Sequence, residues 1–210
     1  MTKKDRGRKK DRMKVEEAAI RVAEEGDGPP IAAIYGPYVR DTAISFEIEP
    51  PTAQMMADRI ARTLETHPWL VAEIGGKVVG YAYAGKHRER PAYRWTVDTT
   101  IYLDTSVHRR GIGRALYLIL LEILRDQGFC SAFAEIVLPN AGSIRLHESL
   151  GFGAIGIHEH IGFKLGCWHD IGYWRMALAQ PTLSPCDPVA FADLRVTSGF
   201  VKRLQLVGSE

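Results

Sequence analysis

The segment from 97 to 114 constrains this chain most, because its pattern predicts a buried strand followed closely by a helix that begins with glycines. The strand ends near Leu103, and Gly111-Ile112-Gly113 begins a long apolar helix. The first N–H groups of a helix have no intrahelical acceptor and lie at the positive end of its dipole, so they bind anions. Asp98 interrupts the strand, and a buried acid is usually either paired or used. We expect an anion site beside a carboxylate that is either a general base or a structural Asp bonded to backbone N–H groups.

Along the rest of the chain, segments whose apolar residues recur with the period of a strand alternate with segments that have the period of a helix. Residues 15–25 fit a helix or a strand, and 44–48 fit a short strand or an extended connection. Asp27 and Thr52 are placed to cap helices, and Gly75-Gly76 marks a hairpin turn. The order predicts an α/β (α+β) layer of helices covering a mixed, twisted sheet. The remaining predicted strands are 69–74, 77–84, 93–103, 131–138, 152–164 and 168–178, and the predicted helices are 31–39, 52–66, 111–127 and 143–150.

Composition is that of an ordinary globular protein. The 210 residues are 46% apolar and 25% charged, which is enough for one domain with a sizeable core. Neither a secretion signal nor an apolar run of about 18 residues is present, so no membrane span is expected. Cys130, Cys167 and Cys186 form no metal-binding pattern. They are interpreted as reduced thiols of a cytoplasmic protein, and no metal is expected.

Charge is unevenly distributed, because the first 14 residues carry eight Lys and Arg against two Asp. Such a tail is either a solvated extension or a contact for nucleic acid or a membrane surface. The body lacks the basic face of a nucleic-acid binder, so neither partner is expected. We predict a basic, disordered extension at 1–17, one domain at 18–180 and a C-terminal extension at 181–210. The last begins with a proline-rich linker and has enough apolar residues to dock on the body or on a partner.

The glycine junction is neither a P-loop nor a dinucleotide fingerprint, because it lacks the Gly-Lys-Ser/Thr ending and the third glycine. Instead, RRGIGRAL at 109–116, followed by Asn140 and LGF at 150–152, resembles the acetyl-CoA core of the Gcn5-related N-acetyltransferase (GNAT) superfamily. Further stretches resemble the phosphinothricin N-acetyltransferase family within it, and the similarity covers roughly residues 18–180. These stretches are WLVAE at 69–73, GYAYAG at 80–85, YRWTVDTTIY at 93–102, RLHESLGF at 145–152 and GCWHDIGYW at 166–174.

This resemblance implies the GNAT fold, with about six to seven strands, splayed central strands and a first strand at 20–23. It also implies acetyl-CoA as co-substrate. The strand at 101–103 would pair with the pantetheine arm, and the backbone from 109 to 114 would hold the pyrophosphate. His108 occupies a place where the superfamily usually has Gln or Arg. The implied cofactor-binding residues are Ile101, Tyr102, Leu103, Arg109, Arg110, Gly111, Ile112, Gly113, Arg114 and Asn140.

The resemblance also assigns the chemistry. An acceptor ammonium must lose a proton, which costs on the order of 3–4 kcal/mol for a pKa about 2–3 units above neutral. Asp98 stands where the family has Glu, so its reach is one methylene shorter and a water relay is favoured. His147 lies seven residues after Asn140, where many members place a Tyr that protonates the leaving thiolate; a satisfied structural histidine is the alternative. The implied substrate-binding residues are Arg88, Arg90, Tyr93 and Asp98.

The predicted function is therefore acetylation of the α-amine of a small amino-acid analogue, of the phosphinothricin or methionine sulfoximine type, by direct attack in a ternary complex. Two alternatives remain at this point. One is an acetyltransferase for another L-amino acid or small amine, and the other is a non-catalytic CoA-binding regulatory module. Members of the family are commonly homodimers, so a homodimer is expected.

Overall fold

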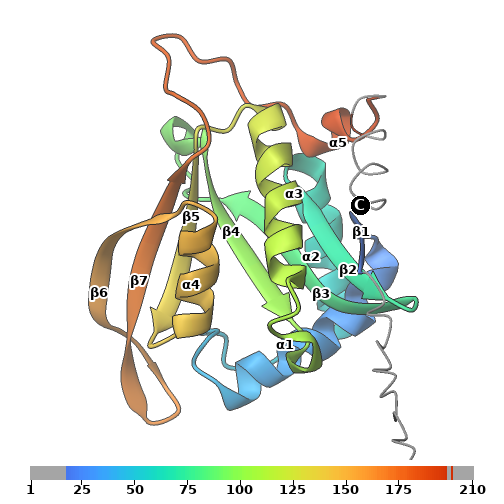
Figure 1. Cartoon of the computed structure of the whole chain (residues 1–210), viewed down its shortest axis with the longest axis vertical. Coiled ribbons are helices and arrows are strands. Elements are labelled where there is room, and N and C mark those ends of the chain that lie inside the picture. The colour runs from blue at the N-terminus through green and yellow to red at the C-terminus, as the bar shows by residue number, and fades with distance from the viewer. Residues whose placement is uncertain (1–17, 198–199, 201–210) are drawn as a thin grey trace, which may run out of the picture.

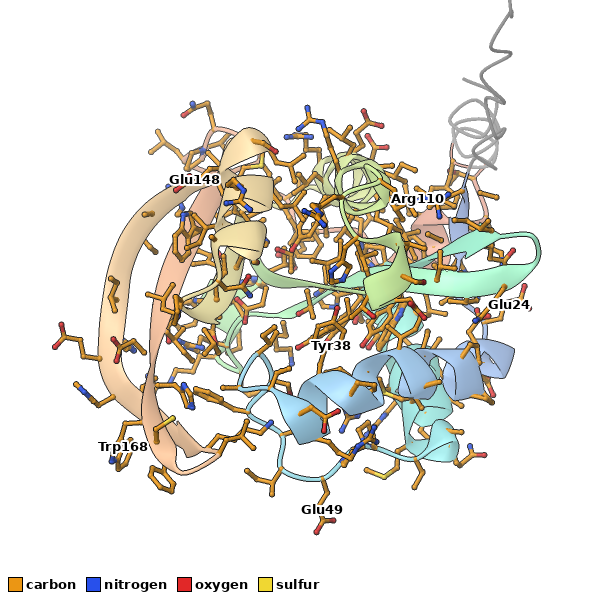
Figure 2. All side chains as sticks on the ribbon, turned by 60° about the horizontal axis from the view of Figure 1, so that its bottom comes forward. Glu24, Tyr38, Glu49, Arg110, Glu148 and Trp168 are labelled. Atoms are coloured by element: carbon orange, nitrogen blue, oxygen red, sulfur yellow. The ribbon has the colours of Figure 1, made fainter. Side chains whose placement is uncertain are left out.

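The computed structural model describes residues 18–197 and 200, which form one seven-stranded sheet with helices on both faces (Figures 1 and 2). The strand order is β1-β2-β3-β4-β5-β7-β6, and every neighbouring pair is antiparallel except β4 and β5. The strands are β1 (Ala19–Val22), β2 (Trp69–Ile74), β3 (Lys77–Lys86), β4 (Thr96–Leu103), β5 (Ser131–Leu138), β6 (Gly153–Lys164) and β7 (Cys167–Ala177). The helices are α1 (Gly28–Asp41), α2 (Ala53–Thr66), α3 (Ile112–Gln127), α4 (Ala141–Ser149) and α5 (Phe191–Leu194).

The parallel pairing of β4 with β5 is short. It joins Thr96 to Ser131, Val97 to Ala132 and Asp98 to Phe133, and no pairing follows. Beyond Asp98, β4 stays paired with β3, whereas β5 stays paired with β7 as far as Leu138. The two strands therefore diverge in the middle of the sheet (Figure 1), which confirms the predicted mixed sheet with splayed central strands.

The two faces of the sheet are covered by different helices, with α3 and α4 on one side and α1 and α2 on the other (Figure 2). Side chains alternate along a strand, so neighbours on β4 point to opposite faces. Thr99 faces α3, where its hydroxyl meets Tyr117. Tyr102 faces α1, where its ring packs edge-on against Tyr35. Asp98 lies on the same face as Tyr102, so the sheet lies between Asp98 and the start of α3.

Helix α1 is longer than the predicted 31–39 and continues through Pro37 to Asp41. Tertiary contacts outweigh the local cost of the proline, because Val39 is fully buried and the Tyr38 hydroxyl donates to the Leu103 carbonyl at 2.6 Å. The first residue of α1 is a tightly packed glycine. A Cβ on Gly28 would lie 2.5 Å from the backbone oxygen of Ala53 at the start of α2.

Asp27 lies at the N-cap position of α1, but the predicted side-chain cap is wrong. Its carboxylate instead accepts two hydrogen bonds from Arg21, at 2.7 and 2.8 Å, and one from the Glu24 N–H. Burial would raise the pKa of Asp27, but these bonds outweigh burial and hold the pKa below its ordinary value. This ion pair fastens β1 to the start of α1. The N-cap Thr52 is confirmed, since it accepts from the Met55 N–H.

Other boundaries differ in detail. Residues 19–22 form a strand, and 44–48 form an irregular connection without strand pairing. The predicted strand at 93–103 begins only at Thr96, because Pro91–Tyr93 form a 3-10 turn.

The segment after β7 returns to the core. Phe191 of α5 is fully buried, and Gln127 donates from Nε2 to the carbonyls of Thr66 and Val189. The domain division at 181 stays a prediction, and the basic extension at 1–17 lies outside the described residues. Within the described part of the chain, no helix is long and apolar enough to cross a membrane, and no group of three His, Cys, Asp or Glu side chains is placed to hold a metal.

Candidate active site

The divergence of β4 and β5 opens a cavity of about 100 Å³ that passes between the two strands. Thr99 and His147 line it from the face of α3 and α4. Tyr102 and Glu135 line it from the opposite face, and Ile44 of the connection between α1 and α2 closes that side. The cavity therefore links the two faces of the sheet. Its full lining is Ile44, Thr99, Thr100, Ile101, Tyr102, Tyr117, Ala134, Glu135, Ile136, Val137, Asn140, Ser143 and His147.

The predicted cofactor-binding strand borders this cavity. Ile101 and Tyr102 line it, and Leu103 follows at the end of β4. On its other side, this part of β4 pairs with β3 through Gly80 and Leu103. Within the described chain, the edge that faces β5 has no strand partner beyond Asp98. Its backbone groups are therefore placed to pair with an extended ligand.

The glycine loop lies against this strand. Gly111 is the N-cap of α3 with φ of +84°, a left-handed conformation that glycine adopts without strain. A Cβ on Gly113 would lie 3.3 Å from the side-chain termini of Ile101 and Leu103 and 3.4 Å from that of Leu146. Glycine thus lets the first turn of α3 approach β4 closely. The N–H groups of this first turn, including that of Ile112, have no intrahelical acceptor.

The arginines of the loop are exposed at the start of α3. Arg109 adopts a positive φ of 60°, and Figure 2 shows Arg110 beside the first turn of α3. Arg114 is tied to α4, since its Nη1 donates to the Ser149 carbonyl at 3.1 Å. The loop thus surrounds the helix start with positive charge, as an anion site requires.

His108 fastens the loop to the rest of the site. Its Nε2 lies 3.0 Å from the Tyr38 hydroxyl, which itself donates to the Leu103 carbonyl. Since that hydroxyl proton is committed to Leu103, Nε2 is the donor to Tyr38. Tyr38 lies between α1 and the sheet (Figure 2). His108, which has no predicted partner, therefore joins the loop, α1 and the end of β4.

Asn140 and His147 lie on the other side of the cavity. Asn140 is the N-cap of α4 and accepts from the Ser143 N–H at 3.1 Å. His147 is 3% exposed, and its Nδ1 donates to the Ser143 carbonyl at 2.8 Å. Its Nε2 is then the acceptor for the Tyr117 hydroxyl at 2.9 Å. Burial lowers the pKa of His147, so the neutral ring is favoured, with its proton on Nδ1.

This pairing means that the Tyr117 hydroxyl proton points to His147 Nε2, and that the hydroxyl itself borders the cavity. Sequence reasoning missed Tyr117, because this residue lies within the apolar stripe of α3, where it is fully buried. Burial raises the pKa of Tyr117 well above its ordinary value, so the hydroxyl keeps its proton.

Asp98 lies on the opposite face and is bonded to a residue that sequence reasoning missed. His87 Nδ1 donates to Asp98 Oδ1 at 2.6 Å. Burial raises the pKa of the Asp98 carboxyl above its ordinary value, and the His87 hydrogen bond opposes that rise. The nearby charges act in opposite directions, because Glu135 raises this pKa and Arg88 lowers it. His87 belongs to a loop of mixed charges, and only the β3–β4 register brings it to Asp98.

The predicted substrate residues are only partly brought together. Arg88 is close enough to Asp98 to influence its charge, and Tyr93 meets the His87 ring edge-on at 6.0 Å. Arg90 is exposed just before the 3-10 turn Pro91–Tyr93, and no described contact joins its side chain to the others. A group of charges on the Asp98 face therefore comes from the β3–β4 loop, β4 and β5.

Comparison with known proteins agrees with this geometry. The family model described as an acetyltransferase (GNAT) domain matches residues 20–172. A phosphinothricin N-acetyltransferase of Streptomyces viridochromogenes is 42% identical over 170 residues, which cover 81% of this chain and 92% of that relative. The L-methionine sulfoximine/L-methionine sulfone acetyltransferase of Salmonella typhimurium is 35% identical over 162 residues, which cover 77% of this chain and 95% of that relative.

A solved structure shows the same fold. A GNAT superfamily phosphinothricin acetyltransferase from Sinorhizobium meliloti, crystallised with acetyl-CoA, superposes with a TM-score of 0.77 at 33% identity. The match covers 83% of this chain and 98% of that one. The residues matched by the family contain the divergent strands, the glycine loop and Asp98. The chain belongs to the phosphinothricin N-acetyltransferase family of the GNAT superfamily and is an N-acetyltransferase.

Proposed function

We propose that this N-acetyltransferase moves an acetyl group from acetyl-CoA to the α-amine of a small amino-acid analogue of the phosphinothricin or methionine sulfoximine type. One observation carries the proposal: the cavity passes through the sheet, with an anion-binding helix start on one face and Asp98 on the other. The names of the relatives support this class of substrate. Another L-amino acid is the second candidate, because an L-amino acid N-acyltransferase of Escherichia coli is 34% identical over 165 residues.

The residues present fit acetyl-CoA. The first turn of α3 offers free N–H groups and positive charge to the pyrophosphate. The space beside Gly111 is open, because a Cβ at this position would have no heavy atom within 4 Å. The unpaired edge of β4 at Ile101 and Tyr102 fits the amide-bearing arm. When bound, acetyl-CoA supplies a thioester carbonyl carbon as acyl donor.

The acceptor site is proposed on the face of Asp98. Gly85 lies directly opposite Asp98 in the β3–β4 register, and a Cβ there would meet no heavy atom within 4 Å. The missing side chain leaves room for an amine beside the carboxylate. Arg88 and Arg90 would bind the acidic end of the acceptor, since arginine binds carboxylates in a bidentate manner, and Tyr93 would form a wall.

The proposed reaction begins with proton transfer from the acceptor ammonium to Asp98, directly or through one water. The freed lone pair forms the new C–N bond to the acetyl carbon while the C–S bond breaks and its electrons leave on sulfur. The acetylated nitrogen loses its second proton, and the sulfur gains one. Overall, one proton is released to solvent for each ammonium acetylated.

His147 stays the predicted source of assistance to the leaving sulfur, and its geometry supports a route through Tyr117. The Nδ1 proton of His147 is held by Ser143, so its Nε2 orients the Tyr117 hydroxyl that borders the cavity. We propose that the hydroxyl turns its proton from Nε2 toward the cavity as the thiolate forms, and so donates a hydrogen bond to the sulfur.

The substrate proposal is tested by measuring thiol release from acetyl-CoA with a panel of amines. We expect the highest kcat/KM with phosphinothricin or methionine sulfoximine and lower values with ordinary L-amino acids. A higher kcat/KM with an ordinary amino acid favours the second candidate. CoA binding without turnover of any amine contradicts both.

Asp98→Asn tests the base. We expect kcat/KM for the amine to fall by about 10²–10⁴ at neutral pH, while the KM for acetyl-CoA stays within about twofold. Wild-type activity should rise with pH as Asp98 ionises, at a pH above the ordinary range of Asp because burial raises its pKa. The variant should lack this limb and respond only to deprotonation of the amine itself. An unchanged pH–rate profile would remove Asp98 from the role.

Tyr117→Phe tests the assistance to sulfur. The change removes one hydroxyl from a buried ring, so we expect the fold and both KM values to be kept and kcat to fall about 10- to 100-fold. Single-turnover kinetics with acetyl-CoA should show the loss in the chemical step. Full activity of this variant would leave His147 and Tyr117 with a structural role.

We further propose a homodimer, supported by apolar side chains exposed along the β6–β7 hairpin. Trp168 lies at its tip, away from the helices (Figure 2). Light scattering after gel filtration should give twice the chain mass, and Phe163→Glu with Trp168→Glu should shift it toward the monomer. A monomeric wild type at micromolar concentration contradicts the proposal. The large apolar residues of this hairpin that are more than half exposed are Ile155, Ile157, Ile161, Phe163, Leu165 and Trp168.

A further inference from the structure

We propose that His87 is a positioning residue for the acyl transfer, which holds the Asp98 carboxylate so that its second oxygen meets the acceptor amine. The inference rests on the proposed function, in which Asp98 accepts the amine proton. It adds a group from outside the strand that carries the base.

The sheet register brings the two residues together. Strand β3 ends at Lys86, and Gly85 lies opposite Asp98 on β4. Side chains at alternate positions share a face, so His87 continues on the face of Gly85 and Asp98. Because Gly85 has no side chain, the imidazole reaches the carboxylate directly, and Nδ1 lies 2.6 Å from Oδ1.

The imidazole is held more firmly than the carboxylate. Its ring stacks on Phe133 of β5, with centroids 4.6 Å apart and planes 22° from parallel, and Tyr93 meets it edge-on. The His87 side chain is 12% exposed, whereas that of Asp98 is 31% exposed. The buried ring thus lies behind the more open carboxylate. With Oδ1 committed to His87, Oδ2 is the oxygen left for the acceptor.

A fixed carboxylate matters here because aspartate has a short reach. A turn of the carboxylate away from the amine would lengthen the proton transfer, and a small misplacement of a reacting group lowers the rate strongly. A charge-assisted hydrogen bond resists that turn.

Other charged or titratable groups face this pair, and they must stay unchanged in a test. Arg88 lies on the β3–β4 loop, Glu135 on β5, Tyr173 on β7 and Tyr83 on β3. Tyr93 of the 3-10 turn meets the ring. None of them is altered by substitution of His87, so a change in the pH–rate profile reports the His87–Asp98 bond.

The test compares His87→Leu, which removes the donor, with His87→Asn, whose amide N–H can replace Nδ1–H. Profiles of kcat/KM for the best amine of the panel are measured against pH, at saturating acetyl-CoA. For His87→Leu we expect a loss of about 10- to 100-fold at neutral pH. Its acid limb should move to higher pH, because burial still raises the pKa of Asp98 and the opposing bond is lost. His87→Asn should recover most of the rate and keep the limb near its wild-type position.

The matched control is Glu89→Gln, which removes an exposed ion pair with Lys86 from the same loop and should leave the profile unchanged. An unchanged profile in His87→Leu overturns the proposal. So does an equal loss in His87→Asn and His87→Leu, because the ring itself would then be required. Should His87→Leu fail to fold, nitrogen NMR of the wild type decides: the His87 signal should show Nδ1–H, and protonation only at Nε2 overturns the proposal. Failure of the base assignment is seen separately, as full activity of Asp98→Asn.

Discussion

The limited pairing of β4 with β5 is the constraint on which the rest of the site depends. Three residue pairs hold the strands together, and beyond Asp98 each strand stays bonded only to its outer neighbour. A buried backbone must satisfy its hydrogen-bonding groups, so an open edge in mid-sheet is stable only where a ligand or water pairs with it. The core around this opening is well packed, with Tyr117 on one face and Trp69 on the other both nearly fully buried. The opening is thus bordered by packed core on both faces of the sheet.

Its position divides the chemistry between the two faces. The proposed base for the acceptor lies on the face of α1 and α2, where Asp98 and His87 meet. The hydroxyl proposed to assist the leaving sulfur lies on the face of α3 and α4, where Tyr117 and His147 meet. In the proposed reaction, proton removal and proton supply therefore take place on opposite sides of one strand, with β4 backbone between them. Such a separation keeps a base and an acid from neutralising each other.

Local patterns in the sequence predict most of the fold, because periodicity, glycine turns and the Thr52 cap act over a few residues. They identify the hairpins, the glycine-opened helix α3 and every strand except β1, which they leave open between helix and strand, although β4 begins three residues later than predicted. They miss what depends on distant contacts: the partner of Asp27, the continuation of α1 through Pro37, and the neighbour of Asp98. The resemblance selects Asp98 and His147, but neither it nor the local pattern points to His87 or Tyr117. A histidine in a charged loop and a tyrosine in an apolar stripe gain their roles only from strand register and helix packing.

The close approach at Gly113 has a consequence for how such motifs change. Three side chains from two other elements, Ile101, Leu103 and Leu146, touch the space that a Cβ would need. The distance between the start of α3 and the edge of β4 therefore depends on the sizes of four residues, which are Gly113 and these three neighbours. A larger residue at one of these positions must be matched by a smaller one at another, or the first turn of α3 and the edge of β4 move apart. The sequence of the glycine loop alone consequently does not determine this distance. The same loop grafted onto another strand and helix would keep its sequence but lose the spacing.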